Sequence, residues 1–429
     1  MRGVSALYRS EARAVYARFA GFGLSAAMLA LTSLVATPSM VAASGPAAWG
    51  SIALGQAVGT VANVVVGWGW ALSGPAAVAR GDASLRRREY TDSIRVRLAL
   101  LVPGSVLAAV MAAILTPHQV SFAVAGAISA TLVALTSSWY FAGLSRPYVW
   151  LVLETLPRVC GTAVGIVLMR SGHSAIVGLV CMSSGMMLAF LCASAWIYRS
   201  TGRAGAERLP GDTLGEVLRS HRHGVASMAG SYLFLNTPMA LVALIAPSVQ
   251  PVYALADRVR QLISAGLNPL VLVFQGWVPR GGEDKLVRRS GLALGATCAV
   301  AVVFAALFLP IAPSLMRWLS DGQISVSELL IVLTALVIAV DLFWGVLENA
   351  VLAAFNRLDI VARASAVSFV AMLPAVAAGT AILGAAGAIL GSFFGQMVRM
   401  TIDLVGGRRI VRDRYHGMSS VEGAGNVDA

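Results

Sequence analysis

The chain has 429 residues, of which 58% are hydrophobic and 12% charged, and its formal net charge at pH 7 is +12. A soluble domain carries about 25% charged residues, so this composition excludes an ordinary soluble protein. Apolar runs of bilayer length recur along the chain without alternating, which excludes an outer-membrane barrel and predicts an all-α polytopic membrane protein. The basic excess does not indicate a nucleic-acid partner, because the Arg residues concentrate in short segments between apolar runs.

The apolar runs predict twelve transmembrane helices. Their approximate ranges are 16–37, 48–72, 96–116, 119–143, 148–169, 174–198, 226–247, 252–279, 290–312, 326–355, 360–383 and 385–406. A long polar stretch, 199–225, separates the sixth from the seventh. We therefore predict two six-helix bundles, 1–198 and 226–407, joined by a linker and followed by a tail at 408–429.

Charge between the spans predicts the orientation. Lys and Arg gather in segments that this division places on one side, such as 80–97, 199–225 and 280–289. This bias places the linker, the tail and both termini in the cytoplasm of a cell whose cytoplasmic (plasma) membrane the chain crosses many times. The four Cys residues lie inside apolar spans without metal or disulfide spacing, so we expect no metal and no cofactor.

The span 252–279 carries the clearest polar face. At helical spacing, one narrow stripe contains Asp257, Gln261, Ser264, Asn268 and Gln275. Arg260 flanks this stripe, and Arg258 lies further round the helix. Polar side chains inside a bilayer are costly, so the stripe is expected to face protein or water. One Asp beside two Arg leaves a positive charge that suits an anionic ligand such as a phosphate or pyrophosphate.

Other spans carry shorter polar faces that we expect to line the same cavity between the bundles. They include Gln56, Thr60 and Asn63 in one span, Glu154 and Arg158 in another, and Thr334, Asp341 and Glu348 in a third. The i,i+4 spacing of Glu154 and Arg158 is equally typical of a salt bridge within one helix. A last face holds Ser392, Gln396, Arg399 and Asp403, where we expect Arg399 and Asp403 to form a structural pair.

Two stretches resemble the polysaccharide flippases of the MATE-like exporter superfamily, which covers multidrug, oligosaccharidyl-lipid and polysaccharide exporters. Ser138–Leu144 (SWYFAGL) resembles their aromatic-Gly-Leu signature, and Tyr253–Val259 (YALADRV) resembles their Tyr-x-x-Ala-x-Arg-Ile pattern. The chain departs from the family at Ala142, where Gln is usual, and at Ser145, where an acidic residue is usual. The twelve-span layout agrees with the family over nearly the whole chain.

The resemblance implies a MATE-like fold and a non-enzymatic transporter that flips an undecaprenyl-pyrophosphate-linked oligosaccharide to the outer leaflet by alternating access. Its partners would be this substrate, membrane lipids and polysaccharide polymerase or assembly enzymes. The implied substrate-binding residues are Arg158, Arg258 and Arg260 for the pyrophosphate, and Gln261, Asn268 and Asn63 for the sugars. Asp341 and Glu348 are the implied coupling residues for a proton or sodium ion.

Three alternatives stay open at the sequence level. A drug or cation antiporter of the same superfamily fits the two carboxylates of span 326–355. A membrane polysaccharide polymerase or glycosyltransferase fits less well, because the five His residues lie in loops or the tail and the sequence shows no Ser/His/Asp set. A general small-solute permease is compatible with the polar stripes.

Overall fold

The computed structural model describes residues 2–116, 118–202, 213–279, 283–355 and 358–425. All of its described elements are helices, which confirms the predicted all-α fold class. The described chain forms two compact units. Unit 1 is Met1–Ala254 with Arg317–Ser325, and unit 2 is Leu255–Met316 with Val326–Ala429. The division into six-helix halves at the linker stays a prediction, and residues 203–212 of that linker lie outside the described residues.

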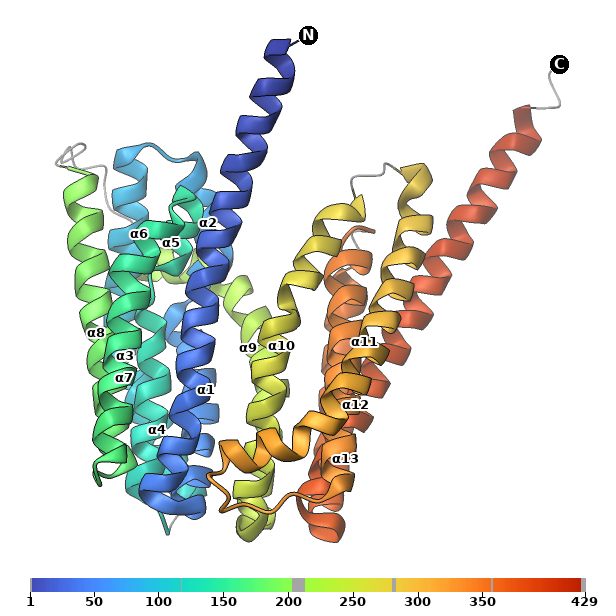
Figure 1. Ribbon diagram of the computed structural model, residues 1–429. Coiled ribbons are helices and arrows are strands. Elements are labelled where there is room, and N and C mark those ends of the chain that lie inside the picture. Colours follow the sequence, from blue (N-terminus) through green and yellow to red (C-terminus); the bar gives the residue numbers. More distant parts are fainter. Residues whose placement is uncertain (1, 117, 203–212, 280–282, 356–357, 426–429) are drawn as a thin grey trace. The chain divides into compact units, whose positions relative to one another are not determined.

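Unit 1 contains the N-terminal helices drawn from blue to yellow-green in Figure 1. In chain order they are α1 (Arg2–Gly67), α2 (Trp70–Arg80), α3 (Ala83–Leu115), α4 (Val120–Leu132), η1 (Val133–Leu135), α5 (Ser138–Leu144), α6 (Pro147–Trp150), η2 (Leu151–Thr155), α7 (Leu156–Arg170), α8 (Ala175–Ser200), α9 (Leu214–Ile245) and η3 (Pro247–Val249). α1 packs along α3, α4 and α7, and α7 packs along α8. The η2 segment is a π-helix, a form that often marks functional sites.

Close packing and aromatic contacts hold unit 1 together. Gly55 of α1 lies so near α4 that a Cβ there would be 2.0 Å from the Ala123 carbonyl oxygen. At one end of the unit, the buried Tyr90 ring lies 5.3 Å from Tyr140 and 6.2 Å from Trp139. α3, which carries Tyr90, begins with a side-chain cap. The Asp82 carboxylate accepts a hydrogen bond from the Leu85 backbone N–H at 2.8 Å, which lowers the pKa of Asp82.

Unit 2 contains most of α10 (Gln250–Trp277) and α11 (Glu283–Leu319), together with α12 (Glu328–Val346), η5 (Leu347–Leu352) and α13 (Leu358–Gly425). Like η2, the η5 segment is a π-helix. The core of unit 2 joins three helices, since Val271 of α10, Ala293 of α11 and Val346 of α12 belong to one buried apolar cluster. α13 packs along α12 and η5.

The helices confirm a polytopic membrane protein. Nine described stretches are long and apolar enough to cross a membrane. The two longest, Gly21–Arg80 and Arg363–Gly407, each contain two predicted spans. They are divided at Gly45 (φ 81°) and at Gly384 (φ 59°), left-handed conformations that glycine adopts without strain. α10 corresponds to the remaining predicted span. Two helices extend beyond their predicted spans at the N-terminal end: α3 begins at Ala83, before the span 96–116, and α9 begins at Leu214, before the span 226–247.

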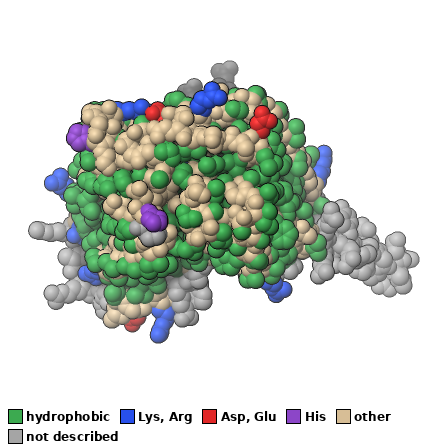
Figure 2. Space-filling view, turned by 90° about the horizontal axis from the view of Figure 1, so that it is seen from below, with side chains coloured by type: hydrophobic (Ala, Val, Ile, Leu, Met, Phe, Trp, Pro, Cys, Tyr) green, Lys and Arg blue, Asp and Glu red, His purple; other side chains and the backbone are tan. Residues whose placement is uncertain are grey.

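Apolar side chains cover much of the described surface. Exposed examples are Val102 at 68%, Val302 at 69% and Ile382 at 77% of their accessible area. In Figure 2, hydrophobic side chains fill much of the view and the Lys, Arg, Asp and Glu side chains appear at its margins. Exposed aliphatic groups in this number are unfavourable in water, so a bilayer is the solvent for this surface.

Replacement of Gly387 tests the packing of the last two spans. A Cβ at Gly387 would lie 1.8 Å from the Gly379 carbonyl oxygen, on the other side of the Gly384 break. We expect Gly387→Leu to lower the thermal unfolding midpoint in detergent, at a cost of at least the ~1–3 kcal/mol of an overpacked core. Gly295→Leu is the matched control, because nothing lies within 4 Å of a Cβ at this glycine in α11. Equal midpoints for the two variants would contradict the close approach.

Candidate functional site

α10 is a membrane-length helix with a polar face. Gln261, Asn268 and Gln275 are all exposed, and their spacing of seven residues places them on one side of the helix. α10 spans 28 residues, yet it is absent from the described stretches that are apolar enough to cross a membrane by composition. The three amide residues of the predicted stripe are therefore exposed on one face, whereas Asp257 is buried and Ser264 is half-buried.

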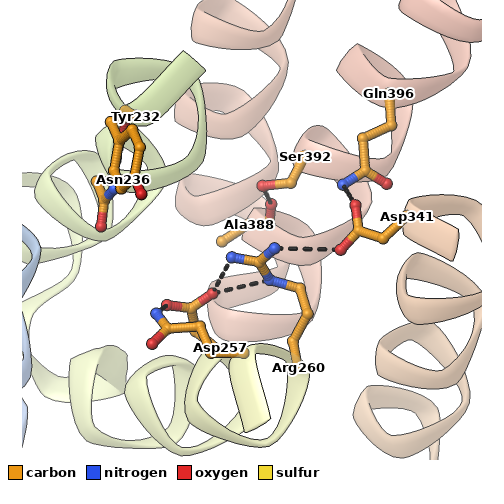
Figure 3. Close-up of polar contacts among 9 residues, drawn as sticks. Tyr232, Asn236, Asp257, Arg260, Asp341, Ala388, Ser392 and Gln396 are labelled. Carbon is orange, nitrogen blue, oxygen red and sulfur yellow. Dashed lines mark hydrogen bonds and ion pairs between the residues drawn. The ribbon is translucent and has the colours of Figure 1, made fainter. Parts of the chain in front are cut away.

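An ion-pair cluster lies beside this stripe, within unit 2. Arg260 of α10 donates to Asp257 Oδ1 from Nε at 2.9 Å and from Nη2 at 2.7 Å, and to Asp341 Oδ2 from Nη1 at 3.1 Å. Figure 3 shows the Arg260 guanidinium between the two carboxylates, one from its own helix and one from α12. The side chains of Arg260, Asp257 and Asp341 are only 15%, 8% and 9% exposed. Water therefore screens these contacts little.

Two amide groups complete the cluster. Gln261 Nε2 donates to Asp257 Oδ2 at 2.8 Å, and Gln396 Nε2 of α13 donates to Asp341 Oδ1 at 2.7 Å. All four carboxylate oxygens thus accept a hydrogen bond. Hydrogen bonds to every carboxylate oxygen make a buried ionic network more tolerable.

The charge balance of this cluster corrects the sequence analysis. The positive surplus was inferred from Asp257 beside Arg258 and Arg260, but Asp341 from α12 joins them. Arg258 interacts electrostatically with Asp257. Two Arg and two Asp residues sum to zero charge. The formal charge of these four residues is therefore balanced, whereas Asp257, Arg258 and Arg260 alone would carry one surplus positive charge.

A second ionic cluster in unit 2 joins η5 to α13. Arg399 donates from Nε to Glu348 Oε1 at 2.8 Å and from Nη2 to Oε2 at 3.0 Å, a two-point contact. The Trp344 ring centroid lies 4.1 Å from the guanidinium carbon. The pair that the sequence analysis expected, Arg399 with Asp403, is not hydrogen-bonded, because neither Asp403 oxygen has a hydrogen-bond partner.

Unit 1 has its own buried carboxylate at Glu154, in the π-helical η2 segment. Its Oε1 accepts from the Thr136 hydroxyl and its Oε2 accepts from the Ser137 backbone N–H at 2.9 Å. Arg158 lies 3.7 Å away, so the i,i+4 salt bridge expected from the sequence is present. Arg97 approaches from α3 and donates to the Thr136 carbonyl oxygen at 2.8 Å.

The structure brings together only some of the predicted site residues. Arg260, Gln261 and Asp341 share one cluster, whereas Asn268 lies further along α10 and Glu348 pairs in the second cluster. Arg158 and the half-buried Asn63 belong to unit 1. Gln396 and Arg399 also belong to the two clusters. Both were predicted to lie on one polar face of their span, but not to pair with Asp341 or Glu348.

Comparisons with known proteins support one fold. No protein-family model matches the chain, and no curated protein matches it.

The chain is similar to a solved structure described as an inward-facing conformation of a multidrug resistance MATE family transporter of the MOP superfamily. The TM-score is 0.51, the identity is 14%, and the match covers 89% of this chain and 95% of that chain. The eukaryotic MATE transporter AtDTX14 matches with a TM-score of 0.49 and 15% identity over 95% of this chain and 99% of that chain. A mutant of the Vibrio cholerae MATE transporter VcmN matches with a TM-score of 0.49 and 14% identity over 94% and 98%. The chain thus has the all-α, polytopic membrane fold of the MATE transporters.

Proposed function

We propose that the protein is a membrane transporter that works by alternating access. The observation that carries this proposal is the exposed amide face of α10. Amide side chains are unfavourable against acyl chains, so a face of three such residues needs a water-filled passage. The fold supports the same conclusion, since a solved structure that the chain matches with a TM-score of 0.51 is described as a transporter.

The proposed substrate is a lipid-linked oligosaccharide, carried on undecaprenyl pyrophosphate, for cell-surface polysaccharide biosynthesis. The motifs at Ser138–Leu144 and Tyr253–Val259 support this choice. Gln261, Asn268 and Asn63 would donate and accept hydrogen bonds with the sugar hydroxyls.

Arg158 is the first candidate for binding the pyrophosphate. Its side chain is 23% exposed, and its contact with Glu154, at 3.7 Å, is longer than a hydrogen bond. Arg260 is already held by two carboxylates, so a phosphate would have to displace one of them. Arg258, which interacts with Asp257, is the third Arg proposed to bind the pyrophosphate.

Coupling to a proton or sodium ion is proposed for Asp341 and Glu348. Each is paired with an Arg from another helix, Arg260 in one case and Arg399 in the other. A cation that binds either carboxylate weakens an interhelical ion pair. Cation binding and helix rearrangement are therefore linked.

The second candidate function is a MATE-like drug or cation antiporter. One observation favours it: the balanced charge of the Asp257, Arg260, Asp341 and Arg258 set removes the positive surplus that argued for an anionic substrate. Under this function the carboxylates would meet a cationic substrate directly.

A reconstituted flipping assay separates the two functions. Proteoliposomes would carry either a fluorescent pyrophosphate-linked oligosaccharide lipid or a fluorescent organic cation. We expect facilitated flipping of the lipid, reduced ~10–100-fold in Arg158→Gln, because the lost charge-assisted hydrogen bonds contribute about 1.5–3 kcal/mol. Arg95→Gln is the matched control, since its side chain is 65% exposed.

Two results would contradict this proposal, one for the lipid substrate and one for the role of Arg158. One is transport of the organic cation with no flipping of the lipid, which would support the antiporter. The other is an equal flipping rate in Arg158→Gln and Arg95→Gln, which would remove Arg158 from the pyrophosphate site.

A further inference from the structure

Asp403 of α13 is a fully buried carboxyl group whose two oxygens meet no N–H or O–H donor. Its exposed fraction is 0%. An ionised carboxylate in such surroundings loses its hydration without hydrogen-bond donors that replace it, which is unfavourable. The neutral, protonated form avoids this penalty. The Asp403 environment therefore favours a bound proton.

The charges around Asp403 support the same conclusion. Glu348 on η5 and Arg399 on its own helix are the charged groups that act on it. Arg399 is committed to Glu348 through two donors. From α12, Asp341 is held by Arg260 and Gln396. The Glu348, Asp403 and Arg399 group thus has two carboxyls for one guanidinium, and one proton makes it neutral.

We propose that Glu348 and Asp403 form a proton-binding site that holds one proton, on Asp403, in the described conformation. A proton fits this site better than a metal cation does, because a metal needs several oxygen ligands and the adjacent guanidinium would repel it. Among the described residues, no three His, Cys, Asp or Glu side chains form a group that could hold a metal ion. The proposal deepens the coupling role of Glu348 and rests on the proposed function only for its use in transport.

The exchange of this proton is a simple acid–base step. On release, the O–H bond of Asp403 breaks, its electron pair stays on the oxygen, and the proton passes to water. The new carboxylate then competes with Glu348 for the Arg399 donors. Uptake reverses these changes. A single proton thereby decides whether Arg399 is shared between α13 and η5 or held by η5 alone.

Infrared spectroscopy of the purified full-length protein in detergent tests the site without any substrate. At neutral pH we expect the carbonyl band of a protonated carboxylic acid, shifted in heavy water. Asp403→Asn should remove this band. Glu348→Gln should also remove it, because Asp403 then becomes the carboxylate that balances Arg399 and loses its proton. Asp321→Asn is the control that keeps the band, since the Asp321 side chain is 39% exposed.

Stability measurements keep the test valid if one variant folds poorly. Asn has the shape of the neutral acid, so Asp403→Asn should unfold within a few degrees of the unchanged protein. If Glu348→Gln does not fold, Asp403→Asn alone decides. A missing band in the unchanged protein, or a full band in Asp403→Asn, overturns the proton site. A band that depends on Asp403 upholds the site, and transport that is indifferent to pH would then contradict only its role in coupling.

Discussion

Replacing Arg260 with Ala is expected to abolish transport and to destabilise unit 2 by about 3–5 kcal/mol. The substitution leaves the carboxylates of Asp257 and Asp341 without the donor that links them, at exposures of only 8% and 9%. The two buried negative charges then exceed the single positive charge of Arg258, repel each other and lack solvent. Loss of unfolding free energy, measured by denaturant titration in detergent, should accompany loss of uptake into proteoliposomes.

Two comparison variants separate the structural effect from the transport effect. Arg288→Ala removes an exposed Arg of the same unit and should change neither quantity. The triple variant Arg260→Met, Asp257→Asn and Asp341→Asn removes all three charges, so it should recover much of the stability without recovering transport. A triple variant as unstable as Arg260→Ala would show that the ion pairs do not explain the loss. Full transport in Arg260→Ala would remove this cluster from the mechanism.

Spacing along single helices predicted much of this architecture. The twelve spans follow from apolar run length, and the breaks at Gly45 and Gly384 fall between predicted spans. The amide face of α10 follows from the helical period alone, because Gln261, Asn268 and Gln275 recur every seven residues. These features depend on local geometry, so a single sequence is enough to predict them.

Partners across helices were not predictable in the same way. Asp341 could be placed on a face of its span, but Arg260 lies 81 residues away in sequence. Arg399 donates its hydrogen bonds to Glu348 and not to Asp403 for the same reason: a carboxylate from η5 offers it two well-aligned acceptors, 51 residues away in sequence. Nothing in the pattern around Glu154 or Glu348 signals the π-helical turns that hold them. The charge balance at the α10 site could therefore be counted only once the structure had placed Asp341 beside Arg260.

Glu154 is the position in unit 1 where we expect the largest effect of a single change. The chain leaves helical geometry between η1 and α5, at Thr136 and Ser137. This break frees a backbone N–H inside the membrane-length segment Val120–Leu144, where no lipid group can satisfy it. Glu154, 1% exposed, supplies the acceptor for that N–H. The carboxylate therefore holds the broken helix and balances Arg158 at the same time.

We expect Glu154→Ala to lower the free energy of unfolding by about 3–5 kcal/mol, because it leaves a buried N–H and a hydroxyl without their acceptor and a guanidinium without its counter-charge. Denaturant titration in detergent measures this loss, and Glu328→Ala, at an exposed carboxylate, is the control. Adding Arg158→Ala to Glu154→Ala should cost less than the two single losses combined, since the unpaired charge is then gone. Glu154→Gln should fall between the unchanged protein and Glu154→Ala, because its amide keeps one of the two acceptor oxygens. If Glu154→Ala matched Glu328→Ala, the broken helix would not depend on this carboxylate.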